Sequence, residues 1–304
     1  MAPTTYLELK QKNDPLVVSA LDWLVLLHKW EQGAPYMPEF LTDSAGVLQT
    51  LPAGWQTVGE IQKQAGVNLT PETQTSNIEG YGSPGPRRTM VTAENFTIDY
   101  FAQEWRKINL EMWHNTDLST VSAAPGQGFK ARKKSQLNVT YYSAILIAYD
   151  GMPQAEVYPF FMYPKIAVSQ RAAMAGQQGS ELGLPMTLTV FDDAAYDSGD
   201  GGMYDFGVCG AGFDDLAVAS GFAAAASSIT VHPSTADLAD GELLQLTVID
   251  SNGYDRTGEC TWSSSAPLDA TVSTSGLVTA VDPGTATITA TLGALTDTCA
   301  VTVA

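Results

Sequence analysis

The end of the chain alternates apolar and polar side chains. Residues 285–290 read Thr-Ala-Thr-Ile-Thr-Ala, which is the period of a strand with one buried face. The segment 227–304 consists almost wholly of Thr, Ser, Val, Ala, Asp and Gly. We predict strands at 228–231, 243–249, 260–263, 270–272, 277–280, 285–291 and 299–303. Short strands at this spacing, with glycine in the turns, are typical of a small β-sandwich.

An Ala-rich and Ser-rich run at 217–228 separates this segment from a more varied one. We predict a domain at 1–218, a linker at 219–227 and a second domain at 228–304. Alanine is also the best helix former, so a short helix inside one larger domain is the alternative.

Four runs in the second domain carry a resemblance to a known family. They are TWSSS at 261–265, ATVS at 270–273, GLVTA at 276–280 and GTATITA at 284–290. Together they strongly resemble the group 2 bacterial immunoglobulin-like domain. The resemblance implies an immunoglobulin-like β-sandwich without catalytic activity, of the kind found on bacterial adhesins and as an appendage on phage virion proteins.

Composition and charge exclude several classes of protein. The chain has 304 residues, of which 44% are hydrophobic, and a net charge of −18 from 15 basic and 33 acidic residues. This charge argues against general binding to a phosphate backbone. The most apolar stretch, 16–27, is interrupted by Ser19 and Asp22 and is shorter than the roughly 20 residues of a membrane span. No signal peptide is visible, so we expect a protein without a membrane partner that is assembled in a cytoplasm.

The first domain is predicted to place one helix against a β-sheet. Phe101, Trp105, Ile108 and Met112 have helical spacing, which predicts an amphipathic helix of about three turns over 101–114, with Lys107 and Glu111 one turn apart. A long alternating segment at 136–149 predicts a hairpin arm or barrel wall. Further strands are predicted at 55–61, 157–163 and 184–191, the second of them near a sheet edge because of Pro159 and Pro164.

This first domain also resembles the major tail tube proteins of long-tailed siphophages. The matching features are LPAGWQTVGEI at 51–61, the Pro86-Arg87-Arg88 turn, and FTIDY at 96–100 running into a helix with Glu104 and Asn109. The resemblance implies a mainly β fold, a β-sandwich or half-barrel with a flanking α-helix. It further implies rings, usually of six copies, that stack into a hollow tube conducting DNA.

Motifs for catalysis are weak, and we predict no enzyme, no cofactor and no catalytic or metal-binding residues. A GxGxxG sequence at 80–85 is followed by Pro86 and contains Pro84, which prevents the helix that a dinucleotide site needs; we predict a loop bearing Arg87 and Arg88. The histidines His28, His114 and His232 lack metal-ligand spacing. Cys209 lies in an acidic stretch, which favours a raised thiol pKa and no reactivity.

Two charged runs and two cysteines remain. Asp192, Asp193, Asp197, Asp200 and Asp205 form the best candidate for a cation site, although a solvated loop is favoured because the EF-hand spacing is absent. The basic run Lys130–Lys134 favours a subunit contact or a solvated face over nucleic acid. Cys260 and Cys299 pair only if their Cα atoms lie within about 7 Å, and reduced thiols are expected in a cytoplasm.

The sequence therefore favours a structural virion protein, a tail tube subunit with an outward immunoglobulin-like domain. Its expected partners are copies of itself in hexameric rings, other phage tail proteins and, weakly, a host cell-surface glycan, while DNA passes through without specific binding. Because residues 1–218 carry 24 acidic and 14 basic residues, we expect a net-negative lumen with Lys130–Lys134 turned away, toward Asp192–Asp205 of a neighbour. The alternatives are a bacterial surface adhesion protein and, third, a carbohydrate-active enzyme.

Overall fold

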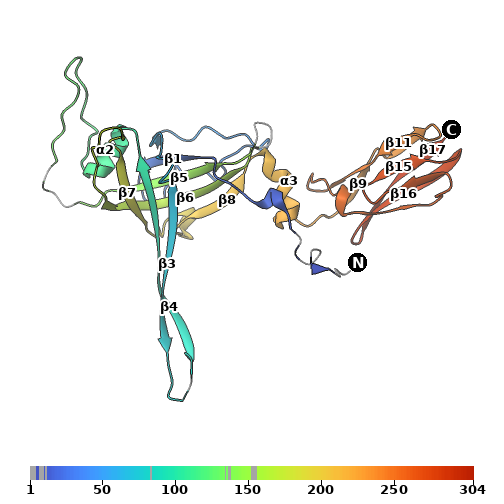
Figure 1. The fold of residues 1–304 in the computed structure, drawn as a ribbon, viewed down its shortest axis with the longest axis horizontal. Helices are drawn as coiled ribbons and strands as arrows, with labels where there is room; N and C mark the ends of the chain where they lie inside the picture. Colours follow the sequence, from blue (N-terminus) through green and yellow to red (C-terminus); the bar gives the residue numbers. More distant parts are fainter. Residues whose placement is uncertain are drawn as a thin grey trace. The chain divides into compact units, whose positions relative to one another are not determined.

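The computed structural model describes residues 5, 6, 10, 12–82, 84–133, 135, 138–151 and 156–304. The chain divides into two compact units, Val18–Gly212 and Phe213–Ala304, the latter grouped with Met1–Val17. Strands dominate both (Figure 1), which confirms the mainly β class. No helix in the described part is long and apolar enough to cross a membrane.

The unit Val18–Gly212 is built on one antiparallel sheet of eight strands (Figure 1). Its strand order is β2-β1-β5-β6-β7-β4-β3, and β8 pairs with the first half of β6. The strands are β1 (Asp22–Lys29), β2 (Gln56–Thr57), β3 (Val67–Ile78), β4 (Arg88–Ala102), β5 (Tyr141–Tyr149), β6 (Tyr158–Arg171), β7 (Leu184–Val190) and β8 (Asp205–Cys209).

The core lies on both faces of the central strands. One face of the sheet buries alternate residues of β7, from Leu184 to Val190, against Ile108 and Met112 of the helix α2 (Lys107–His114). On the other face, Ile145 and Ile147 of β5 pack with Leu41 and the partly buried Trp55 from the long segment between β1 and β2. Strand β5 is therefore buried on both sides.

The predicted helix over 101–114 begins too early. Phe101 and Ala102 continue β4 and pair with Pro185 and Leu184 of β7, and α2 starts only at Lys107. The helix ends at Asn115, which adopts the left-handed conformation that stops a helix. Lys107 and Glu111 do not pair, since Lys107 Nζ donates to the carbonyl oxygens of Ser119 and Val121.

Three strand predictions were wrong in part, either in extent or in place within the sheet. Strand β5 starts at Tyr141, with Gln136 and Leu137 outside the described residues, and it lies inside the sheet between β1 and β6 rather than in a hairpin arm. Strand β6, which was predicted near a sheet edge, is also interior. The register between β5 and β6 shifts at Tyr142/Ala144, opposite Pro164. The N–H group that proline lacks is therefore not needed for a hydrogen bond between these two strands. Of the strand predicted at 55–61, only Gln56–Thr57 forms.

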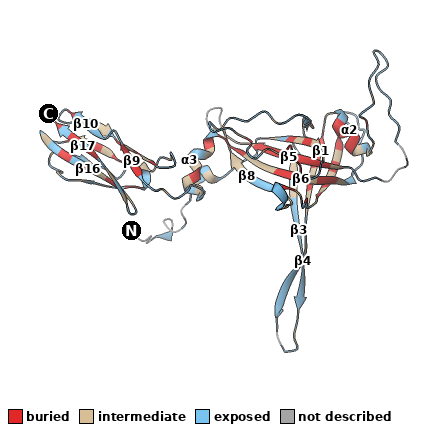
Figure 2. Cartoon of the chain, turned by 180° about the vertical axis from the view of Figure 1, so that it is seen from behind, coloured by how far each residue is buried: buried red, intermediate tan, exposed pale blue. Residues whose placement is uncertain are grey.

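Strands β3 and β4 form a hairpin that extends beyond the sheet (Figure 1). Strand β4 pairs with β7 only from Thr97 onward, so residues 88–96 pair with β3 alone. At about 3.4 Å per residue, these nine residues give a free length of roughly 30 Å. We call this part, residues 71–96, the arm; nearly all of its described residues are exposed (Figure 2).

The second unit is a β-sandwich of three small sheets, ordered β10-β17-β16-β13, β11-β15-β14 and β12-β9. Its core contains Val231, Leu246, Val248, Val278 and Ile288. The strands are β9 (Ile229–His232), β10 (Thr235–Leu238), β11 (Leu243–Gln245), β12 (Thr247–Asp250), β13 (Thr261–Ser264), β14 (Ala270–Val272), β15 (Leu277–Ala280), β16 (Gly284–Leu292) and β17 (Leu295–Val303).

Most strands predicted in this unit are confirmed within a residue or two. The prediction over 243–249 merged two strands, because the chain passes from one sheet to another at the buried Leu246. Strand β10 was missed. The Ala-rich run at 217–228 is partly helical, since the helix α3 spans Ala211–Ser220.

Candidate functional site

Over β7, β4 and β3, one face of the first unit's sheet is covered by no helix of the described residues, and most of its side chains are polar. Phe101 and Pro185 lie on this face, and its polar side chains likewise alternate with the core positions: Asn68, Thr70, Thr97, Asp99, Thr187 and Thr189. The hydroxyl of Thr187 donates to the carboxylate of Asp99 at 2.5 Å, which joins β7 to β4. We call these six residues the polar face. It contains one carboxylate and no basic residue.

The outer edge of the same sheet is formed by β3. This strand has 12 residues, and among the described strands it pairs only with β4. An edge strand of this length presents unpaired backbone groups to any further strand. Exposed apolar side chains lie along the arm and at its tip: Ile78, Tyr81, Met90 and Val91.

The opposite edge of the sheet is only partly covered. Strand β2 pairs with β1 at Leu26 and Leu27 alone, and the N–H of Val58 donates to the carbonyl oxygen of Val25. The start of β1, Asp22–Leu24, pairs with β5 on one side, and no described strand pairs with it on the other side. The sheet thus has two unlike edges that are open.

Residues of the segment 51–61 meet residues at the start of α2 in the structure. The Glu104 carboxylate accepts hydrogen bonds from the N–H of Glu60 at 2.9 Å and from Arg106 Nε at 2.6 Å. Both hydrogen bonds lower the pKa of Glu104, and the one from Arg106 has the larger effect. Asn109 Nδ2 donates to the carbonyl oxygen of Val58 at 2.7 Å. Gly59 has φ +78°, and a Cβ there would lie 2.3 Å from the Glu104 side chain. This set of contacts fixes 58–60 against the start of α2.

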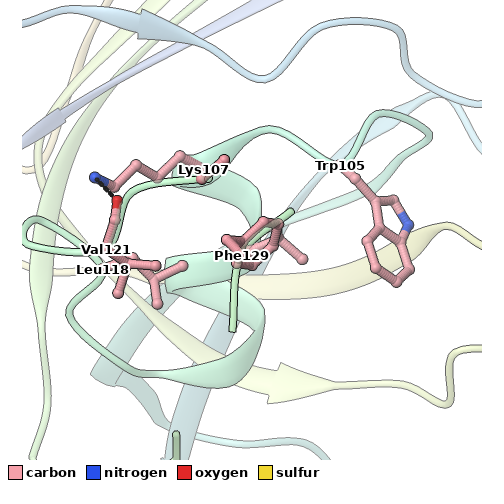
Figure 3. Close-up of a pocket in the computed structure, with 7 residues that line it drawn as sticks. Trp105, Lys107, Leu118, Val121 and Phe129 are labelled. Atoms are coloured by element: carbon pink, nitrogen blue, oxygen red, sulfur yellow. Dashed lines mark hydrogen bonds between the residues drawn. The ribbon is translucent and has the colours of Figure 1, made fainter. Parts of the chain in front are cut away.

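A pocket beside α2 was not foreseen from the sequence. It has a volume of about 210 Å³ and is lined by Trp105, Lys107, Leu110, Leu118, Val121, Ala123 and Phe129. Leu118, Val121 and Phe129 gather beside the helix, and Trp105 lies to one side (Figure 3). Trp105, predicted as part of a helical stripe, is 51% exposed. No local pattern connects Trp105 to Phe129, because the pocket forms only when the segment after α2 folds back.

The acidic run does not form a single solvated loop. Asp193 is buried and accepts Trp30 Nε1 at 2.9 Å, the N–H of Gly33 at 3.0 Å and the N–H of Ala195 at 3.2 Å. Asp205 accepts a hydrogen bond from the hydroxyl of Tyr196. The pKa of Tyr196 is raised, mainly because its phenol is buried and secondly because of the Asp205 carboxylate.

Asp192, Asp197 and Asp200 are exposed. The described residues include no group of three or more His, Cys, Asp or Glu side chains arranged to hold a metal ion.

The basic run lies in the exposed segment between α2 and β5, apart from Lys134, which is outside the described residues. Lys133 Nζ donates to the carbonyl oxygen of Asn115 at 2.6 Å. The GxGxxG sequence joins β3 to β4 at the tip of the arm, with Ser83 outside the described residues and Arg88 as the first residue of β4.

The three cysteines differ in location: Cys209 lies in the first unit, and Cys260 and Cys299 lie in the second. Burial raises the pKa of the Cys209 thiol to about 11, so desolvation rather than nearby acids is the leading cause. Cys299 lies opposite Ile288, which lies opposite Ser264, and Cys260 is four residues before Ser264. Two strand spacings and four residues of strand separate the two Cα atoms by roughly 16 Å. A disulfide needs less than about 7 Å, so Cys260 and Cys299 do not pair.

Comparison with known families identifies the second unit. Residues 225–303 match the model of the Bacterial Ig-like domain (group 2). The match extends over nearly all of the β-sandwich and confirms the immunoglobulin-like part of the sequence prediction. No curated protein matches the chain.

Proposed function

We propose that this chain is the major tail tube subunit of a long-tailed bacteriophage, a structural virion protein whose copies form rings that stack around a DNA channel. The observation that carries the proposal is the eight-stranded sheet of the first unit, which combines two open edges with a polar face. A subunit of a closed ring needs two different surfaces that fit each other head to tail.

The open edges provide such surfaces. Strand β3 offers 12 residues with one side unpaired, and Asp22–Leu24 of β1 offers a shorter opposite edge. Pairing of β3 with the β1 edge of the next copy would extend the sheet around a ring without ending it. The arm supports the same reading, since a two-stranded ribbon is marginally stable alone and gains stability by packing against a partner.

The polar face supports the role of a channel wall. Its six residues include Asp99 as the single charged group. DNA binds proteins mainly through cations that neutralise its phosphates. A wall of threonine, asparagine and aspartate lets a polyanion slide past without binding, which accords with the expected net-negative lumen.

The immunoglobulin-like unit would then lie outside the tube and bind surfaces weakly, for example a host cell-surface glycan. The expected location is the virion tail, assembled in the bacterial cytoplasm. A bacterial surface adhesion protein is the alternative, favoured by the same Ig-like match, and in that case the chain would act as a monomer with a ligand.

Negative-stain electron microscopy of the purified full chain tests the proposal. We expect rings or tubes. A matched variant replaces residues 74–93 by Asn-Gly, a two-residue turn between the paired Thr73 and Glu94. This variant should remain folded, since the removed residues touch no core cluster, but should form no tubes.

A full chain that stays monomeric by light scattering at high concentration, with and without other tail components, contradicts the proposal. Tubes formed equally well by the shortened variant would contradict the role of the arm.

A further inference from the structure

The pocket beside α2 continues into a second pocket of about 160 Å³, and the two share Trp105, Leu110, Leu118 and Phe129. We call the joined space the aromatic groove. Leu110 and Leu118 are buried, while Trp105 and Phe129 are each 51% exposed. Two half-exposed aromatic rings over an aliphatic floor are an arrangement that favours insertion of an apolar side chain.

The rim of the aromatic groove is basic. Lys107, His114 and Lys133 line it, and Lys130 and Arg132 belong to the same exposed segment. No carboxylate lines either pocket. Lys107 and Lys133 contact backbone carbonyl oxygens rather than acids, so their charges are not neutralised by the contacts found in the described part. The groove therefore fits an apolar group flanked by carboxylates.

The immunoglobulin-like unit presents such a surface. Residues 225–303 contain nine acidic residues and one basic residue, a net charge of −8. The single basic residue, Arg256, is largely buried between Asp250 and Glu259. The exposed charge of this unit is thus almost entirely negative.

Exposed aliphatic side chains lie among these acids at one place. The N–H of Gly241 donates to the carbonyl oxygen of Ala280, and the N–H of Val281 donates to that of Asp269, which brings three loops together. Leu268 is 82% exposed there. We define the acidic-apolar patch as Asp240, Glu242, Leu243, Leu268, Val281 and Asp282, all of them exposed.

We propose that the aromatic groove of one copy binds the acidic-apolar patch on the immunoglobulin-like unit of a second copy. Leu268 would enter between Trp105 and Phe129, with Asp240, Glu242 and Asp282 facing Lys107, Lys130 and Lys133. The inference rests on the proposed self-assembly and goes beyond it, because it gives the immunoglobulin-like unit a role in joining subunits.

Other surfaces of the chain fit the groove less well. The acidic run keeps the exposed carboxylates of Asp192, Asp197 and Asp200, but residues 192–205 expose no large apolar side chain that could enter between the two rings. The tip of the arm carries the exposed Tyr81 but also Arg87 and Arg88, which would face a basic rim. Among these surfaces, the patch combines exposed carboxylates with an exposed apolar side chain, Leu268, and therefore fits the groove best.

Photo-cross-linking of the full chain tests the contact. Phe129 is replaced by a benzophenone amino acid, and isotope-labelled and unlabelled chains are mixed before assembly so that links between copies are distinguished by mass. We expect links between copies to peptides containing Leu268 or Val281. Any of three results would overturn the proposal: cross-links within one chain, cross-links to residues 192–205, or assembly without any cross-link to the patch.

Paired variants test the chemistry. Lys130→Glu with Lys133→Glu should lower the yield of this link at least about tenfold, because like charges then face each other. Adding Asp240→Lys and Asp282→Lys in the same chain should restore part of it. Leu268→Ser should lower the yield about tenfold through lost apolar burial, and Lys12→Glu with Lys63→Glu is the control of equal charge change that should leave it unaltered.

The two proposals fail differently. Tubes with links elsewhere overturn the docking and leave the tube role intact. A link at the patch in dimers or small oligomers without any tube supports the docking and counts against the tube role.

Discussion

Replacing Asp193 by Ala or Asn should destabilise the first unit, because this buried carboxylate organises two loops. It accepts three hydrogen bonds, from Trp30 Nε1, the N–H of Gly33 and the N–H of Ala195. Asp193→Ala removes the acceptor of these three partly buried donors. At about 1 kcal/mol or more for each unsatisfied donor, we expect a loss of about 3–5 kcal/mol in the free energy of unfolding.

Asp193→Asn should cost less. Its amide oxygen replaces Oδ2 and keeps the bonds from Trp30 and Gly33, while its NH₂ group faces the N–H of Ala195. One unsatisfied donor and the loss of charge predict a cost of about 1–3 kcal/mol. Asp192→Asn is the matched control, since it removes the same charge one residue earlier from an exposed side chain, and it should change stability by less than about 0.5 kcal/mol.

Urea unfolding followed by tryptophan fluorescence measures these differences. Five of the six tryptophans, Trp23, Trp30, Trp55, Trp105 and Trp113, lie in the first unit, so its transition dominates the signal. With a slope of about 2–3 kcal/mol per molar urea, Asp193→Ala should lower the midpoint by about 1–2 M. Equal effects of Asp192→Asn and Asp193→Asn would refute the assignment of Asp193 as the acceptor that holds the loops.

Three further predictions follow from local geometry. Gly54→Ala should destabilise the first unit by more than about 1 kcal/mol, since Gly54 has φ +106° and a Cβ there would lie 2.2 Å from His28 Nε2. Gly66→Ala is the control for the strain of a positive φ, because nothing lies within 4 Å of a Cβ at Gly66. Equal losses of stability in the two variants would contradict the clash with His28. Tyr100→Phe should leave stability unchanged or raise it by up to about 1 kcal/mol in thermal unfolding, because the buried Tyr100 hydroxyl has no partner among the described residues. Burial raises the pKa of Cys260 and Cys299, so both thiols should react with iodoacetamide slowly at pH 8 and fully after unfolding, and mass spectrometry that finds a disulfide between them would contradict the register of β13, β16 and β17.

The immunoglobulin-like unit was the more predictable part, for a physical reason. Its strands have one face toward a single core, so apolar residues alternate with Thr and Ser, and the turns between them carry glycine. In β16 the alternation of Ala286, Ile288 and Ala290 with threonines gives the strand and its buried face directly. Leu246 broke the pattern because a change of sheet is set by the partner strands rather than by the local sequence.

The first unit was less predictable because its central strands are buried on both faces. In β5, residues from Tyr142 to Ala148 are all buried, and a run of this kind has no period that reveals which strands flank it. The stripe of Phe101 and Trp105 matched a helix by spacing, yet Phe101 pairs with Pro185, a residue more than eighty positions away. The prediction of a solvated loop was wrong at Asp193 for the same reason, since two of its three donors, Trp30 and Gly33, are 163 and 160 residues away in the sequence.

The placement of charge connects the sheet to the proposed assembly. The polar face carries one carboxylate and no cation, while six of the 12 basic residues of Val18–Gly212 lie within 106–134, where Glu111 is buried. A DNA channel requires cations to be absent from its wall, and a contact between acidic subunits requires them elsewhere. The basic residues of the segment 106–134 lie around α2, on the side of the sheet opposite the polar face. This placement keeps cations away from the proposed channel wall and makes them available for a contact between subunits. Reversing Asp193 as part of a charge swap is unsuitable, because that residue is structural; the exposed acids of the immunoglobulin-like unit are the partners to exchange.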